Sequence, residues 1–245
     1  MRRAATTGWM RYAALAALLC CALAPAQTRD PYAAPRRALI AELQAEARGD
    51  AGSLTRIDSD VLVVMGRVPR HLYVPKDELA HAYENRPLAI GHGQTISQPY
   101  IVALMTTLVQ PRAGQRILEI GTGSGYQAAV LAESGASVHS IEIIEPLAAQ
   151  AAQRLRGYRN VVTRTGDGYY GWKDAAPFDS IIVTAAASSI PPPLLAQLKP
   201  GGRLVIPVGS SFFTQTLLLV QKDAQGRVRT RQILPVRFVP LTGGH

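Results

Sequence analysis

Residues 119–125 read Glu-Ile-Gly-Thr-Gly-Ser-Gly and follow directly after the apolar pair Ile117 and Leu118. Glycines at positions 121, 123 and 125 let a backbone turn sharply and approach a ligand where a Cβ would collide. The residues after them, from about 126 to 134, are predicted to form a helix. A strand, a glycine-rich turn and a helix in this order predict a site for a nucleoside cofactor, and the alternative is an ordinary tight turn between strand and helix.

The spacing of the glycines distinguishes between classes of nucleoside site. A dinucleotide fingerprint has the form G-x-G-x-x-G, and here Tyr126 stands where its third glycine would be. The spacing instead fits the acidic-x-G-x-G-x-G loop of S-adenosylmethionine (SAM) enzymes. We therefore predict that the cofactor contacts Glu119, Gly121, Thr122, Gly123, Ser124 and Gly125.

Two further acids are predicted at the carboxyl ends of strands, where doubly wound sheets bind ligands. Glu142 lies 17 residues beyond Gly125, a distance at which an acid usually accepts both ribose hydroxyls. The alternative for Glu142 is a solvated charge at the end of the strand. Glu145 is a nearby acid that could be mistaken for the ribose acceptor. Asp167 precedes Gly168 at the third strand end, where its carboxylate would accept from the exocyclic amine of adenine. An ordinary Asp-Gly turn is the alternative for Asp167.

Ser97 is the candidate catalytic residue, in a polar, glycine-bearing segment that leads into a helix predicted from Pro99. The alternative for Ser97 is a helix N-cap, whose hydroxyl would be bonded to a backbone N–H. A hydrolase triad is not supported, because the chain has no G-x-S-x-G elbow. Metal catalysis is not supported either, because no two histidines show ligand spacing on a shared helix.

The order of the predicted elements indicates the fold class. Strands are expected at 116–120, 138–143, 161–165, 179–184 and 203–208, and helices between them at about 126–134, 146–156 and 191–198. This alternation predicts an α/β fold with a doubly wound, mostly parallel sheet. Residues 216–222 and 228–239 predict a C-terminal antiparallel hairpin. Upstream, helices are expected at 36–47, 59–65 and 99–109, and residues 68–99 are rich in proline and glycine, which indicates a substrate-side segment or lid.

The first residues of the chain predict a secretory leader. Three arginines precede the apolar run from Ala13 to Ala24, and Ala24-Pro25-Ala26 is a cleavage signature. The run of about a dozen residues is too short to span a bilayer, which needs about 20. The expected organisation is a leader at 1–26, a linker at 27–35 and one main domain at 36–245. Within that domain, 36–99 holds the N-terminal helices and substrate-side segment, and 100–245 is the SAM-binding core.

Removal of such a leader would also remove Cys20 and Cys21, the two cysteines of the chain. The mature chain would then contain no disulfide, thiolate metal site or cysteine nucleophile. Its formal net charge would fall from +9 to +6, because three arginines and no acids are lost. The excess is spread along the chain, which favours a solvated basic surface over nucleic-acid binding. We expect an exported, periplasmic monomer without stable membrane association, and the alternative compartment is the cytoplasm, where SAM is available.

A shortened chain that begins at Gln27 is expected to be soluble and as active as any longer form, because the predicted leader carries none of the candidate site residues. Activity assays of the shortened and full-length proteins, side by side, measure this directly. An inactive shortened chain beside an active full-length protein would contradict the signal-peptide interpretation.

Several strings of the sequence occur in the order seen in protein-L-isoaspartate O-methyltransferases, and the chain closely resembles that family from about Arg36 to Thr242. Glycine-loop similarity alone would indicate only a SAM enzyme, whereas the Gln-Thr-Ile-Ser-Gln-Pro string at 94–99 is far more specific. The strings are Val68–His71, Gly93–Pro99, Leu118–Tyr126, Gly166–Tyr169, Ala176–Asp179, Thr184–Ala187, Lys199–Gly202 and Phe238–Leu241.

The resemblance implies a seven-stranded SAM-dependent methyltransferase fold and a role for particular residues. Ser97 matches the family's active-site serine, Gln94, Thr95 and Ile96 would lie with it against cofactor and substrate, and Thr242 matches a threonine near the cofactor pocket. The implied reaction is methylation, by SAM, of the α-carboxylate of L-isoaspartyl residues in damaged proteins and peptides. The alternatives are a SAM-binding module without catalysis, and a small-molecule or RNA methyltransferase on the same fold.

Overall fold

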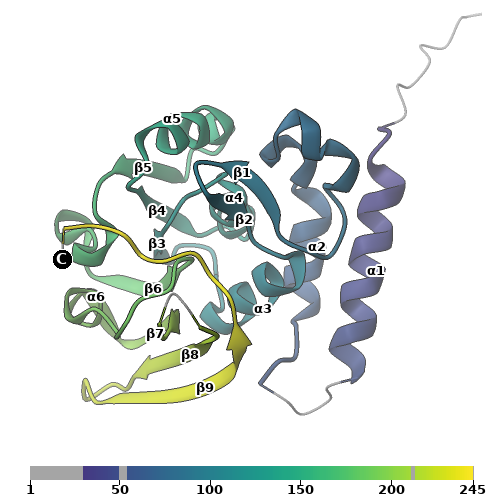
Figure 1. Ribbon diagram of the computed structural model, residues 1–245. Coiled ribbons are helices and arrows are strands. Elements are labelled where there is room, and N and C mark those ends of the chain that lie inside the picture. The colour runs from purple at the N-terminus through teal and green to yellow at the C-terminus, as the bar shows by residue number, and fades with distance from the viewer. Residues whose placement is uncertain (1–29, 50–53, 211–212, 245) are drawn as a thin grey trace, which may run out of the picture. The chain divides into compact units, whose positions relative to one another are not determined.

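Four parallel strands of five or six residues each form one half of a seven-stranded sheet in the computed structural model (Figure 1). The strand order is β5-β4-β3-β6-β7-β8-β9, and the pairs are parallel from β5 to β7 and antiparallel from β7 to β9. The predicted α/β fold, with a mostly parallel sheet and a C-terminal antiparallel hairpin, is confirmed. The strands are β3 (Arg116–Ile120), β4 (Ser137–Glu142), β5 (Val161–Thr165), β6 (Phe178–Val183), β7 (Leu198–Val208), β8 (Gln215–Lys222) and β9 (Val228–Val236).

The structure describes residues 30–49, 54–210 and 213–244, and the predicted leader at 1–26 lies outside them. Residues Tyr32–His245 form one structural unit. Its α-helices are α1 (Ala33–Gly49), α2 (Ser59–Arg67), α3 (Pro99–Val109), α4 (Tyr126–Glu133), α5 (Glu145–Arg154) and α6 (Pro192–Gln197).

Side chains that alternate along β3 fill two cores, one on each face of the sheet. Ile117 belongs to the core shared with α1 to α5, whereas Leu118 and Ile120 belong to the core shared with α6. Figure 1 shows α1, α2 and α3 together on one side of this unit, with α6 on the other face of the sheet. Helices on both faces leave the carboxyl ends of the parallel strands open for a ligand.

The segment between α2 and α3 contains short elements that the sequence pattern did not predict. Two 3₁₀ helices, η1 (Arg70–Tyr73) and η2 (Lys76–His81), precede a hairpin of β1 (Leu88–Gly91) and β2 (Gln94–Ile96). The hairpin turns at His92, which together with the glycines on either side has a positive φ. Such a turn suits a two-residue hairpin, but strands of four and three residues are too short to show a clear period.

Three predicted boundaries were wrong by three residues or more, and one of them is the end of β9, which lies at Val236 rather than at residue 239. Helix α1 begins at Ala33, so the last residues of the predicted linker are helical. Strand β7 begins at Leu198 rather than at residue 203, and it continues through Gly201, which has a φ of 80°. The register against β6 shifts between Phe178 and Ser180. A bulge of this kind keeps a glycine inside a strand where the sequence pattern indicates a turn. Three further 3₁₀ turns are η3 (Leu155–Gly157), η4 (Gly168–Tyr170) and η5 (Lys173–Ala175).

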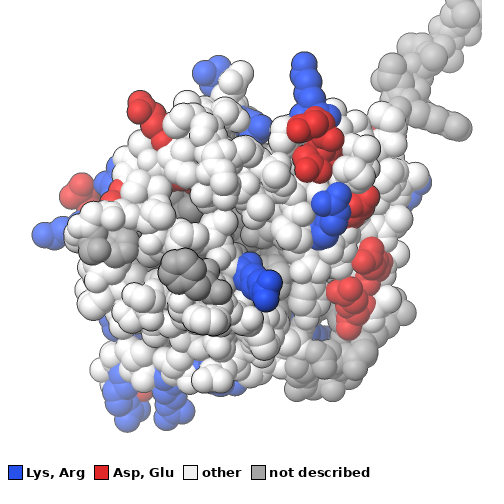
Figure 2. Space-filling view, viewed as in Figure 1, with Lys and Arg blue, Asp and Glu red and all other residues white. Residues whose placement is uncertain are grey.

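Charged side chains are unevenly placed on the face seen in Figure 2. Basic side chains gather at the β8–β9 hairpin, and acidic ones gather on the side where α1 lies, whereas the central part of this face is mostly uncharged. None of the helices in the described part of the chain is long and apolar enough to cross a membrane.

Candidate functional site

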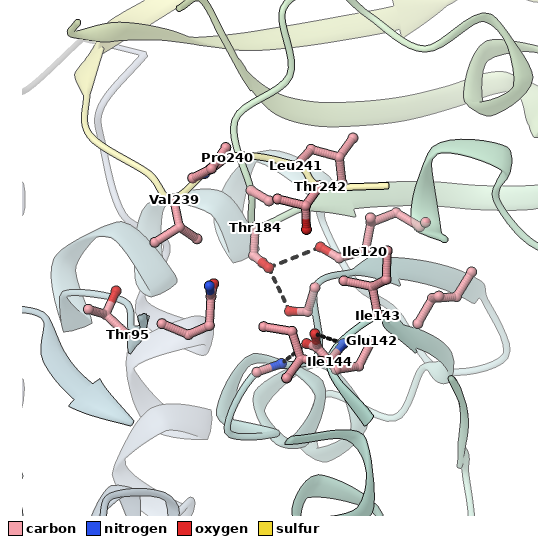
Figure 3. Close-up of a pocket in the computed structure, with 16 residues that line it drawn as sticks. Thr95, Ile120, Glu142, Ile143, Ile144, Thr184, Val239, Pro240, Leu241 and Thr242 are labelled. Carbon is pink, nitrogen blue, oxygen red and sulfur yellow. Dashed lines mark hydrogen bonds between the residues drawn. The ribbon is translucent and has the colours of Figure 1, made fainter. Parts of the chain in front are cut away.

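Two neighbouring cavities lie at the carboxyl ends of the parallel strands, and the glycine loop lines the first of them (Figure 3). Of the predicted site residues, the first cavity is lined by Gln94, Thr95, Gly121, Gly123, Glu142, Gly168 and Thr242. Figure 3 shows Glu142 and Ile144 across from Val239, Leu241 and Thr242, with Thr184 between the two groups. The first cavity is therefore closed by the strand ends on one side and by the C-terminal segment on the other.

Thr184 holds the start of the glycine loop, and the sequence analysis did not assign it a role. Its hydroxyl lies 2.9 Å from the carbonyl oxygen of Ile120 and 2.6 Å from that of Gly121, and it donates to these acceptors. Gly121 has a φ of 92°, and a Cβ at that position would collide with the Thr184 hydroxyl. The close approach of a residue 63 positions away explains why only glycine fits there. The one feature of the sequence that could have indicated this role is the position of Thr184 at the end of a strand.

Glu142 is buried at the end of β4 and binds the backbone of the glycine loop and of the residues just after its own strand. Its Oε2 accepts from the Gly123 N–H at 2.7 Å, and its Oε1 accepts from the Ile144 N–H at 2.9 Å. The alternative of a solvated strand-end charge is therefore wrong, since only 6% of the residue is exposed. Glu145 is exposed as the first residue of α5 and does not line the cavity.

Glu119 does not line either cavity, although the sequence analysis placed it among the cofactor contacts. Its carboxyl is fully buried under the loop and accepts a hydrogen bond from the Ser140 hydroxyl, which is itself 2.6 Å from the Thr122 hydroxyl. Burial raises the pKa of Glu119 to about 8, although the hydrogen bond from Ser140 opposes this rise. Glu119 therefore supports the loop from below. Five other predicted contact residues also lie outside both linings: Ile96, Thr122, Ser124, Gly125 and Asp167.

Asp167 forms a local turn and also contacts the C-terminal segment. Its Oδ1 accepts from the Tyr169 N–H at 2.9 Å, as in the Asp-Gly turn considered from sequence, and its Oδ2 accepts from the Gly244 N–H at 3.1 Å. Asp167 itself is outside the lining, whereas its neighbour Gly168 is part of it. The carboxylate therefore lies beside the cavity edge.

The second cavity has a volume of about 460 Å³ and is lined by Ser97. The N-cap of α3 is Gln98, whose side chain makes no capping bond, and the Tyr100 N–H in the first turn donates to the Asn85 side chain at 3.0 Å, so the N-cap alternative for Ser97 is wrong. Arg237 is the one charged residue in this lining, which holds no aspartate, glutamate or histidine among the described residues. A cavity whose one charged lining residue is a cation suits an anionic group better than a cationic one.

Thr95, Thr184 and Val239 line both cavities, so the two cavities adjoin. A ligand in the first cavity would therefore lie against a ligand in the second. The described residues contain no group of three or more histidine, cysteine, aspartate or glutamate side chains that could hold a metal ion. The arrangement is suited to a reaction between two bound organic molecules.

The C-terminal segment after β9 was predicted to contribute only Thr242, but it lines the first cavity from Val239 to Thr242. Hydrogen bonds fix it to the residues after β6. The Ala186 N–H donates to the Val239 carbonyl at 2.8 Å, and the Leu241 N–H donates to the Ala186 carbonyl at 2.7 Å. The other lining residues missed from sequence are mostly apolar strand-end residues: Ile120, Ile141, Ile143, Ile144, Ala185, Pro240 and Leu241.

Comparison with known proteins agrees with this architecture. Residues 42–245 match the family described as Protein-L-isoaspartate(D-aspartate) O-methyltransferase (PCMT). The chain is 63% identical over 220 residues to protein-L-isoaspartate O-methyltransferase 2 of Syntrophobacter fumaroxidans, covering 88% of this chain and 89% of that protein. It is 59% identical over 238 residues to protein-L-isoaspartate O-methyltransferase 1 of Cupriavidus necator, covering 95% and 91%.

The fold is also similar to a solved structure of a candidate protein-L-isoaspartate O-methyltransferase from Plasmodium falciparum, in complex with S-adenosyl-L-homocysteine. The TM-score is 0.71 at 25% identity, with 84% of this chain and 98% of that chain covered. The family match extends over most of the chain and includes both cavities. This chain belongs to the protein-L-isoaspartate (D-aspartate) O-methyltransferase family.

Proposed function

We propose that this chain methylates the α-carboxylate of L-isoaspartyl residues in proteins and peptides, and that Ser97 orients that carboxylate. The observation that carries the proposal is the contact between the two cavities through Thr95, Thr184 and Val239. The cofactor would occupy the cavity at the glycine loop, and the isoaspartyl group would occupy the cavity at Ser97. Close approach and alignment of two reactants supply a large part of the rate in reactions of this type.

The acceptor carboxylate needs no general base from the protein. An α-carboxyl group has a pKa of about 3.3–3.7, so it is already an anion at neutral pH. The absence of histidine and carboxylate side chains among the described residues that line the Ser97 cavity fits this chemistry. What the protein must supply is a hydrogen bond that orients the carboxylate, together with exclusion of water.

The first cavity has the chemistry to hold SAM, which would supply a sulfonium methyl group. Glu142 would accept from the ribose hydroxyls, because its carboxylate lies at the cavity wall. Gly123 leaves room for a ligand. A Cβ added to this glycine would have the Ile90 Cδ1 atom, 3.5 Å away, as its nearest neighbour. Apolar strand-end residues, including Ile143 and Ile144, would pack against the rest of the cofactor.

A repair assay tests the proposed function. The methyl ester of an isoaspartyl residue is expected to cyclise spontaneously to a succinimide, whose hydrolysis partly restores normal aspartate. With SAM and the protein, an isoaspartyl peptide should therefore convert in part to its aspartyl form, as measured by chromatography. Conversion at the same rate without SAM or without protein would contradict the proposal.

Glu142→Ala is expected to lower SAM affinity by more than tenfold. The change removes up to two charge-assisted hydrogen bonds to the ribose, each worth about 1.5–3 kcal/mol, and it also frees the Gly123 N–H that the carboxylate now holds. Glu145→Ala is the matched control, because this exposed neighbour lies outside the cavity lining. Calorimetry of SAM binding gives both affinities. A larger loss at Glu145 than at Glu142 would show that the ribose acceptor is wrongly assigned.

A further inference from the structure

Arg70 is a fully buried cation in η1 that the proposed reaction does not use. Its Nε donates to the Ala82 carbonyl at 3.0 Å, and its Nη2 donates to the Ser97 carbonyl at 2.9 Å. The guanidinium carbon lies 4.9 Å from the centre of the Tyr126 ring. Arg70 therefore joins the substrate-side segment to the first residue of the helix that follows the glycine loop.

The environment of the Arg70 side chain is unfavourable for the stability of the fold. None of the described carboxylates forms an ion pair with it, and its Nη1 has no hydrogen-bond partner. Burial lowers the pKa of Arg70 to about 10, so the side chain remains charged at neutral pH. A buried charge without a carboxylate partner carries a desolvation cost that no ion pair repays. A buried group left partly unsatisfied calls for a functional explanation.

The contact with Ser97 provides such an explanation. Ser97 lies between β2 and α3, outside both elements, so neither fixes the direction of its carbonyl. The side chains of Ile96 and Pro99 are buried on either side and hold the path of the chain. The hydrogen bond from Arg70 to the Ser97 carbonyl fixes the rotation of the peptide unit between Ser97 and Gln98. The direction of the Ser97 hydroxyl depends on this rotation.

We propose that Arg70 is a positioning residue, which fixes the backbone of Ser97 so that its hydroxyl orients the acceptor carboxylate. The inference rests on the proposed function of Ser97. A displacement of about 1 Å in a group that orients a reactant can cost about a hundredfold in rate. Loss of Arg70 should therefore reduce turnover while it leaves SAM affinity nearly unchanged, because Arg70 lines neither cavity.

A double-mutant cycle with Ser97 tests this inference on the full chain. Arg70→Met keeps much of the side-chain volume and removes both hydrogen bonds, and we expect kcat on an isoaspartyl peptide to fall at least tenfold, with SAM affinity within threefold of wild type. In a Ser97→Ala background, the same change should lower kcat by less than threefold, since the hydroxyl that Arg70 positions is already absent. Arg70→Lys can donate to one carbonyl and should give an intermediate kcat.

Arg203→Met is the matched control. Arg203 also donates to a backbone carbonyl, that of Leu108 at 3.2 Å, but it pairs with Ser180 within the sheet and lines neither cavity. Its loss should change the melting temperature and leave kcat within twofold. If Arg70→Met does not fold, the cycle is measured with Arg70→Lys.

Independent effects at Arg70 and Ser97, or a normal kcat in a folded Arg70 variant, would overturn the inference. Failure of the wild-type protein to methylate the isoaspartyl peptide would instead contradict the proposed function, so the two failures are distinguishable.

Discussion

Gly123→Val abolishes SAM binding while the sheet still folds; this is the expected result of a calorimetric titration on the purified variant. Gly123 lines the first cavity, and the branched side chain would occupy space that the cofactor needs. The variant should also be less stable, because Gly123 has a φ of 52°, a conformation that β-branched residues adopt only under strain.

Gly226→Val separates these two effects. Gly226 has a φ of 82° in the turn between β8 and β9, and an added Cβ there meets nothing within 4 Å. It should therefore lower the melting temperature in the same way and bind SAM with the affinity of the wild type. Unchanged SAM affinity in Gly123→Val would show that the glycine loop is not the cofactor site.

Ser97→Ala is expected to reduce turnover on an isoaspartyl peptide by tenfold or more, which corresponds to about 1.4 kcal/mol on the barrier. Folding and SAM affinity should stay close to wild type, because Ser97 lines the second cavity and does not cap α3. Loss of an N-cap would instead cost about 0.5–2 kcal/mol of stability and leave turnover nearly intact.

Ser180→Ala is the matched control for a lost hydroxyl. The Ser180 hydroxyl is buried, donates to the Val109 carbonyl at 2.9 Å, and lines neither cavity. This variant should be less stable and turn over normally. Normal turnover of Ser97→Ala would remove the catalytic assignment and leave Thr95, which lines both cavities, as the next candidate.

The sheet and the glycine loop were predictable because each depends on local patterns. Apolar runs separated by helical stretches identify β3 to β6 to within a residue or two, and the loop glycines follow β3 directly. The hairpin of β1 and β2 was not predicted, because its strands are too short for a period. What decides that hairpin is packing of Leu88 and Ile96 into the core, which involves distant helices.

The support of the site depends on contacts between distant parts of the chain, and no local pattern reveals them. Thr184 reaches the loop across 63 positions, and Arg70 reaches Ser97 across 27. Glu119 shows the opposite case, since its place in the motif predicted a cofactor contact but its alternation along β3 points it into the core. A strand-end acid can lie on either face, and the register of the sheet decides which.

Methyl transfer to a matched pair of peptides tests the central claim most directly. One peptide carries an L-isoaspartyl residue and the other carries an aspartyl residue at the same position, and both are incubated with the protein and SAM labelled in the methyl group. We predict labelling of the isoaspartyl peptide as a base-labile ester and none of the aspartyl peptide above background. Equal labelling of both peptides, or labelling of neither under conditions where SAM binds, would contradict the account.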